Sequence, residues 1–156
     1  MPTIKAHPRT AEQLSHQLIV RLFRGDDWKS LYQLIQAGLD KKAFKAQTVT
    51  EFLEHAITES AARSALRPYL VTERSWKRRV SEKSPLSASE LDRLTDVGEV
   101  IREARRIWGD NDAAERFLTC PHPRLRGKRP VEVAATEGGA QAVRELMSRI
   151  QEGAPA

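Results

Sequence analysis

The feature that most constrains this fold is a short proline-rich run in the second half of the chain. Residues 121–130 contain three prolines and one glycine, and they lie between two stretches with amphipathic helical patterns. Each proline removes a backbone N–H donor and fixes φ, and the residue before it is pushed toward extended conformations. The run therefore cannot continue a helix, and we expect a basic loop here.

Elsewhere the pattern of apolar residues predicts helices. In the longest pattern, residues 88–108, apolar side chains return every three or four positions, and Ser87 and Glu90 have capping-box spacing just before it. A shorter pattern begins at Thr10. No run alternates apolar and polar residues for long enough to indicate a strand. The sequence therefore predicts an all-α fold.

Capping residues and prolines mark further helix boundaries. Thr48, Thr58 and Thr136 are predicted to be N-caps. Pro68 is predicted to stop or bend the helix that follows Thr58. Pro130 suits the first position of a short helix, where its missing N–H costs nothing.

Composition suits one ordinary domain or two small ones. The 156 residues are 40 % hydrophobic and 30 % charged, as in soluble globular proteins. No apolar run approaches the roughly 20 residues that span a bilayer, and the N-terminus lacks the apolar core of a signal peptide. The single cysteine, Cys120, cannot form an internal disulfide. We therefore expect a cytoplasmic protein that does not associate with a membrane.

Charge is divided unevenly along the chain. Residues 1–81 hold 14 Lys/Arg and 8 Asp/Glu, whereas residues 82–156 hold 12 and 13. The basic first half could meet a polyanion, and the second half suits protein binding or packing. The plainer alternative is that these side chains only solvate helix faces.

Residues 58–81 have the form of a helix-turn-helix, with a second helix rich in basic residues. Trp76 and Val80 are expected to face inward and the basic residues outward. Arginine can read guanine, and lysine more often meets phosphate. A solvated surface helix is the alternative from spacing alone. The candidate DNA-binding residues are Thr72, Arg74, Ser75, Lys77, Arg78 and Arg79.

Catalytic and metal-binding patterns are weak. Cys120 and His122 are two residues apart, but nothing nearby in the sequence supplies further tetrahedral ligands or a catalytic partner. No phosphate-binding glycine loop, dinucleotide fingerprint or zinc-protease motif occurs. We expect no catalytic residues, no metal and no cofactor.

Short motifs follow one another from residue 86 onward. They are Leu86–Leu94, Trp108-Gly109-Asp110, Phe117-Leu118, Pro121-His122-Pro123, Gly127, Pro130, Thr136, Gly139-Ala140, Arg149-Ile150 and Gly153. In order and spacing they resemble the C-terminal toxin-binding domain of the Xre/MbcA/ParS antitoxins. The resemblance spans nearly all of residues 86–153. The chain departs from the family pattern at His122, where Asn is usual, at Arg126, where Gly is usual, and at Val133-Ala134-Ala135, where a bulkier leucine pair is usual. The helix-turn-helix residues before Val71 also match poorly.

The resemblance implies a function for the whole chain. Such antitoxins bind a toxin encoded beside them, commonly of the RES type that destroys NAD, and cover its active-site cleft. They dimerise and repress their own operon through operator DNA. The residues implied in toxin binding are His122, Arg124, Arg126, Arg129, Arg149, Glu152, Gly153 and the terminal Ala156.

Three regions follow from these patterns. We expect a flexible arm at residues 1–9, a helical DNA-binding and dimerisation region at 10–84, and a toxin-binding domain at 85–156. Two alternatives stay open: a stand-alone helix-turn-helix regulator without a toxin, and an adaptor that binds only protein.

Overall fold

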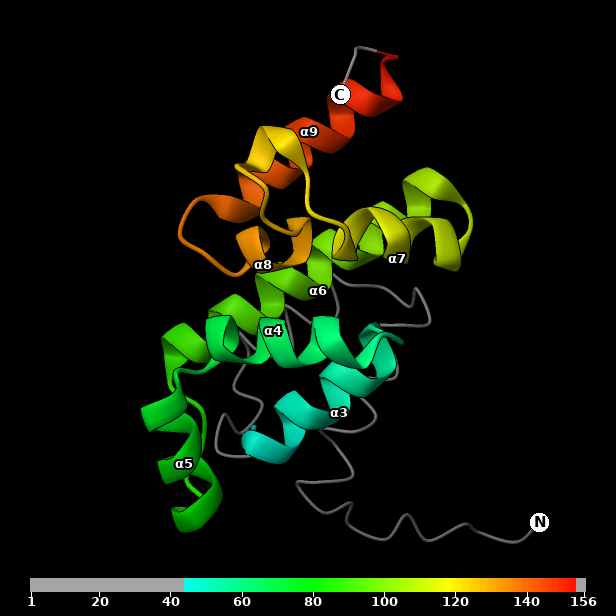
Figure 1. Cartoon of the computed structure of the whole chain (residues 1–156). Helices are drawn as coiled ribbons and strands as arrows, with labels where there is room; N and C mark the ends of the chain where they lie inside the picture. Colours follow the sequence, from blue (N-terminus) through cyan, green and yellow to red (C-terminus); the bar gives the residue numbers. More distant parts are fainter. Residues whose placement is uncertain (1–43, 154–156) are drawn as a thin grey trace, which may run out of the picture.

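The computed structural model describes residues 44–153. Within this range the chain forms seven α-helices and one 3₁₀ turn, with no strand, so the all-α prediction is confirmed. The arm and the helix predicted to begin at Thr10 lie outside the described residues. Figure 1 shows the arrangement of the helices.

The helices follow one another through short connections. They are α3 (Ala46–Ala56), α4 (Ser60–Leu70), α5 (Glu73–Glu82), α6 (Ala88–Trp108), α7 (Asn111–Thr119), the 3₁₀ turn η2 (Pro123–Leu125), α8 (Pro130–Ala134) and α9 (Gly139–Gln151).

Helix α6 lies at the centre of the described helices (Figure 1). Its bounds are those predicted, and Ser87 and Glu90 form the predicted capping box, with each side chain accepting from the other residue's backbone N–H. Gly109 ends the helix in the left-handed conformation. The helix packs against α7, α8 and α9, and also against α3 and α4. Its burial therefore joins the two halves of the described structure.

The apolar core is continuous across these helices. One cluster of buried residues runs from Phe44 before α3 to Met147 in α9, and it includes Leu66 of α4 and Ile101 of α6. The cluster crosses the position between residues 84 and 85 where a domain boundary was expected. That boundary stays a prediction.

Two boundaries near α3 and α4 were placed slightly wrongly. Helix α3 begins two residues before Thr48, whose side chain accepts from the Lys45 backbone N–H at 3.0 Å as the third helical residue. The N-cap of α4 is Glu59 rather than Thr58. Capping residues fix a helix start only to within a turn, because the same side chain can serve as cap or as first-turn partner.

Pro68 does not stop its helix. It lies inside α4, which continues to Leu70. Proline removes the single hydrogen bond that its own N–H would donate. Its ring also crowds the carbonyl four residues earlier, and burial of Leu66 and Leu70 in the core keeps the last turn helical despite both costs.

The turn between α8 and α9 also differs from expectation. The N-cap of α9 is Gly138, with φ of 71°, and not Thr136. The Thr136 hydroxyl instead donates to the Val133 carbonyl at 2.6 Å. A Cβ at Gly139 would lie 1.7 Å from that same carbonyl oxygen. Glycine is therefore required at residue 139 by close backbone approach.

We predict that Gly139→Ala lowers the free energy of unfolding by about 1–3 kcal/mol, because the added methyl group would force the α8–α9 turn apart. Urea unfolding would measure the loss. The matched control is Gly138→Ala, where the added Cβ meets open space. There we expect only the roughly 1–2 kcal/mol cost of a left-handed non-glycine residue. A smaller loss at residue 139 than at residue 138 would contradict this account of the turn.

Candidate functional site

Two exposed features lie at opposite ends of the described structure. Helix α5 projects from one end, and the C-terminal end of α9 reaches the other (Figure 1). The proline-rich loop of residues 121–130 lies in the same half of the molecule as α9. The predicted DNA-binding and toxin-binding residues are therefore on separate surfaces.

The N-terminal half of α5 presents the expected polar residues. Thr72 is its N-cap, and its hydroxyl accepts from the Ser75 backbone N–H at 3.3 Å. Arg74, Lys77 and Arg78 are exposed. These side chains form a basic face that could meet phosphate groups.

Two expectations for α5 were wrong. Val80 does not face inward: among the described residues it is a large apolar side chain that is 53 % exposed. Arg79 does not face outward, because its guanidinium pairs with the carboxylate of Glu90 in α6. Within α5 no residue is fully buried, and Trp76 is only half-buried. The helix leaves the core after one turn, which exposes the second apolar position.

The turn between α4 and α5 is fastened by one arginine. The guanidinium of Arg67 lies over the ring of Trp76, 4.6 Å from its centroid. It also forms an ion pair with Glu73 in the first turn of α5. A cation over an aromatic face is attracted by the ring quadrupole. The start of α5 is thereby held against α4.

His122 closes the proline-rich loop. Its backbone N–H donates to the Lys128 carbonyl at 3.1 Å, and its Nδ1 accepts from the Arg124 backbone N–H at 3.2 Å. Its ring also meets Phe117 edge-on, with centroids 6.3 Å apart. Asparagine, usual in the resembled family, can accept the same backbone hydrogen bond. His122 therefore shapes the loop from within.

Arg126 holds the tip of this loop in an unusual backbone conformation. Its φ is 57°, in the left-handed region that favours glycine. Its side chain is exposed. The family's usual glycine suits this backbone, so the arginine is present despite a conformational cost.

The loop's basic side chains fall into two groups. Arg124, Arg126 and Lys128 are exposed. Arg129 instead donates to the Thr119 carbonyl and to Glu132, each at 2.9 Å. Arg129 therefore fastens the start of α8 to the end of α7.

The end of α9 is open to solvent. Arg149 and Gly153 are exposed, and Gly153 has φ of 77°. The Glu152 carboxylate accepts from the Ser148 hydroxyl at 3.1 Å. Ala156 lies outside the described residues.

Several charged contacts gave no signal in the sequence. Arg144 of α9 pairs with Glu99 at 2.9 Å and with Glu103 at 3.6 Å, both in α6. Arg105 of α6 donates to the Ala56 carbonyl at 3.3 Å. Burial lowers the pKa of Arg105, while nearby Glu115 raises it. These contacts join residues about 40 to 50 positions apart, beyond the reach of helical spacing.

Cys120 and the acidic and histidine side chains were the other candidates for chemistry among the described residues. Cys120 is an exposed free cysteine, and no group of three His, Cys, Asp or Glu residues within 44–153 could hold a metal ion. No helix in that range is long and apolar enough to cross a membrane.

Comparisons with known proteins agree with this architecture. Residues 103–153 match the family model of the antitoxin Xre/MbcA/ParS C-terminal toxin-binding domain. The resemblance to these antitoxins is confirmed, with the family model matching from residue 103 rather than from residue 86. The chain is also 24 % identical over 152 residues to Antitoxin Xre of Pseudomonas putida, covering 88 % of this chain and 93 % of that protein. The matched range runs from the second half of α6 to the end of α9, and it contains the proline-rich loop.

Asp96 of α6 provides a pH-dependent prediction within this architecture. Burial, followed by the charge of Glu99, raises its pKa, and Arg144 lowers it in part. The folded chain therefore binds this proton more tightly than the unfolded chain. The ionised carboxylate destabilises the fold above its raised pKa, and protonation removes that cost as the pH falls toward the ordinary aspartate pKa of 3.8.

We predict that Asp96→Asn raises the melting temperature near neutral pH and that this gain shrinks toward about pH 4. Thermal unfolding followed by circular dichroism at both pH values would show it. A melting temperature that falls in the variant at neutral pH, or a gain that does not depend on pH, would contradict the assignment.

Proposed function

We propose that this chain is an antitoxin that neutralises the toxin encoded beside it by covering that toxin's active-site cleft. The observation that carries the proposal is the match to a toxin-binding domain over residues 103–153, which include the exposed loop and the end of α9. The chemistry belongs to the toxin, and the antitoxin acts by steric exclusion without a cofactor.

The proposed contact surface consists of the loop tip and the last turn of α9. His122 keeps the loop closed, which presents Arg124, Arg126 and Lys128 to a partner. Arg129 supports this surface from behind through its bonds to Thr119 and Glu132. Preorganised charges of this kind mainly set specificity and association rate.

We propose a RES-type toxin that degrades NAD as the partner. A pocket for an anionic dinucleotide should be basic, so an anionic group would complement it. Glu152 at the end of α9 and the C-terminal carboxylate of Ala156 are the anionic groups that we propose fill the toxin's nucleotide pocket and so plug it. Arg149 and Gly153 belong to the same proposed contact.

A second proposed activity is repression of the chain's own operon. The exposed face of α5 supplies Arg74, Lys77 and Arg78 for operator DNA, with Thr72 and Ser75 at the helix start. Arg79 is left out of this contact set because its guanidinium pairs with Glu90. We propose that the homodimer forms within residues 10–84, which would place two copies of α5 on a palindromic site.

The separation of the two surfaces supports simultaneous binding. Helix α5 and the end of α9 lie at opposite ends (Figure 1), so a toxin at one end leaves the other open to DNA. The alternative, a stand-alone regulator, requires only the α5 surface. Purification of the native chain distinguishes the two, because only an antitoxin carries a bound toxin.

We predict that deleting residues 149–156 releases toxicity when the chain is co-expressed with the product of the adjoining reading frame. Cell growth and cellular NAD would be measured, with circular dichroism to confirm that the shortened chain still folds. The control is Arg74→Ala/Lys77→Ala/Arg78→Ala, which should lose DNA binding and still protect the cells. Full protection by the shortened chain would refute the plug, and toxicity with unchanged NAD would refute the RES assignment.

We also predict that Arg126→Gly separates stability from binding. Glycine relieves roughly 1–2 kcal/mol of left-handed strain and loses roughly 0.4–1 kcal/mol through the freer unfolded chain. Unfolding free energy should therefore stay constant or rise slightly. Toxin affinity should fall severalfold, mainly through slower association, because one exposed charge is removed.

Surface plasmon resonance would measure the rate of toxin association. Arg102→Ala, which removes one exposed charge from α6 outside the matched range, is the control and should leave association unchanged. Equal association by Arg126→Gly and the native chain would remove Arg126 from the toxin contact.

A further inference from the structure

Helix α5 packs against α3, and few polar contacts within residues 44–153 fix its direction. Its first turn is held by Arg67, which pairs with Glu73 and lies over Trp76. No residue of α5 is fully buried, and Val80 in its last turn is 53 % exposed. The C-terminal half of α5 therefore buries little apolar surface, and the hydrophobic effect contributes little to its attachment to the core.

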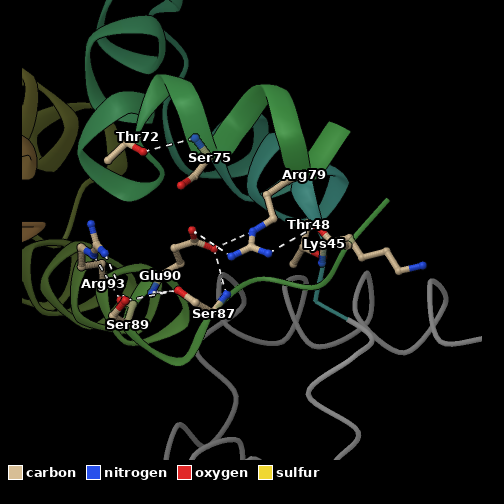
Figure 2. A network of polar contacts seen from close by, with 10 residues as sticks. Lys45, Thr48, Thr72, Ser75, Arg79, Ser87, Ser89, Glu90 and Arg93 are labelled. Carbon is tan, nitrogen blue, oxygen red and sulfur yellow. Dashed lines mark hydrogen bonds and ion pairs between the residues drawn. The ribbon is translucent and has the colours of Figure 1, made fainter. Parts of the chain in front are cut away.

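The second fastening is the ion pair between Arg79 and Glu90 (Figure 2). The Arg79 Nε donates to one carboxylate oxygen of Glu90 at 3.2 Å, and its Nη2 donates to the other at 3.4 Å. Nη1 reaches the Ser84 hydroxyl at 3.3 Å. Two parallel bonds between a planar guanidinium and a carboxylate fix direction as well as distance.

The pair is shielded from solvent. The side chains of Arg79 and Glu90 are 13 % and 7 % exposed. The same Glu90 carboxylate accepts from the Ser87 backbone N–H at 2.9 Å as part of the α6 capping box. A nearly buried carboxylate without its cation would be costly. The Arg79 guanidinium therefore stays paired with Glu90 and does not bind another anion.

Glu90 belongs to α6, the central helix against which α7, α8 and α9 pack. The ion pair thus fixes the far end of α5 to the start of this central helix. From this geometry we infer that Glu90 is a positioning residue for operator binding, acting through Arg79 to set the direction of the basic face of α5. The inference rests on the proposed DNA-binding role of α5.

A direct DNA contact by Arg79 would have the opposite consequence. Breaking the pair would then free a guanidinium for phosphate and remove a negative charge, and both changes strengthen DNA binding. If Glu90 positions α5, breaking the pair weakens specific binding although the chain becomes more basic. The sign of the change distinguishes the two roles.

The test is Glu90→Gln in the full chain, assayed on duplex DNA carrying the promoter of its own gene. Glutamine at the third helical position still accepts from Ser87, so the capping box is retained while the charge is lost. We expect operator affinity to fall about tenfold, a typical coupling between contacting groups. Binding to a scrambled duplex of equal length should not weaken.

Two further variants complete the design. Glu99→Gln removes a more exposed ion-pair partner from the same helix, since Glu99 meets Arg144 at 2.9 Å with side chains 31 % and 30 % exposed, and it should leave operator affinity unchanged. Arg79→Met should weaken specific binding about as much as Glu90→Gln, and the double variant should be no weaker than either alone. Additive losses would overturn the inference.

Hydrogen exchange gives a readout that needs no DNA. The amides of residues 79–82 should exchange about tenfold faster in Glu90→Gln and unchanged in Glu99→Gln, because local opening follows lost contacts. If the native chain binds no operator, the proposed repression fails while exchange still reports whether Glu90 holds α5. Unchanged exchange in α5, or tighter operator binding by Glu90→Gln, would overturn the positioning role.

Discussion

The burial of α6 is the constraint on which the other described helices depend. Apolar residues on several sides of this helix enter one core, so α3 and α4 pack against it as well as α7, α8 and α9. A helix that is covered on several faces cannot tilt without opening all of these contacts. The two candidate surfaces are therefore attached to one common support. Charged contacts reinforce it, since Arg144 holds α9 to α6 and Arg105 holds the end of α3.

Local sequence signals predicted the part of the fold that is decided locally. Ser87 and Glu90 placed the start of α6 correctly, and Gly109 its end, because each acts on backbone groups within one turn. Pro68 does not end its helix because burial of Leu66 and Leu70 outweighs both the lost hydrogen bond and the clash of the proline ring with the preceding turn. The prediction that Thr136 caps α9 was wrong because its hydroxyl donates to the Val133 carbonyl in the preceding turn.

The candidate site was predicted less completely, and the reason lies in α5. Helical spacing placed Val80 inward, yet the helix projects beyond the core and the position is exposed. Spacing also placed Arg79 among the outward basic residues, although a carboxylate eleven positions later in the chain takes its guanidinium inward. Periodicity states which residues share a face but not how far the neighbouring surface extends. The loop shows the same limit, because nothing in its sequence separates Arg129 from Arg124.

Ion pairing therefore divides the basic residues of this chain by role. Arg79 joins α5 to α6 through the nearly buried carboxylate of Glu90. Arg129 pairs with Glu132 at the start of α8 and joins it to α7 through the Thr119 carbonyl. Arg74, Lys77 and Arg78 in α5, and Arg126 and Lys128 in the loop, are exposed and available to a partner. The strained backbone at Arg126 strengthens this division. Glycine would fit the backbone at residue 126 better, so folding alone does not account for an arginine there. We therefore look for its role in what the loop binds.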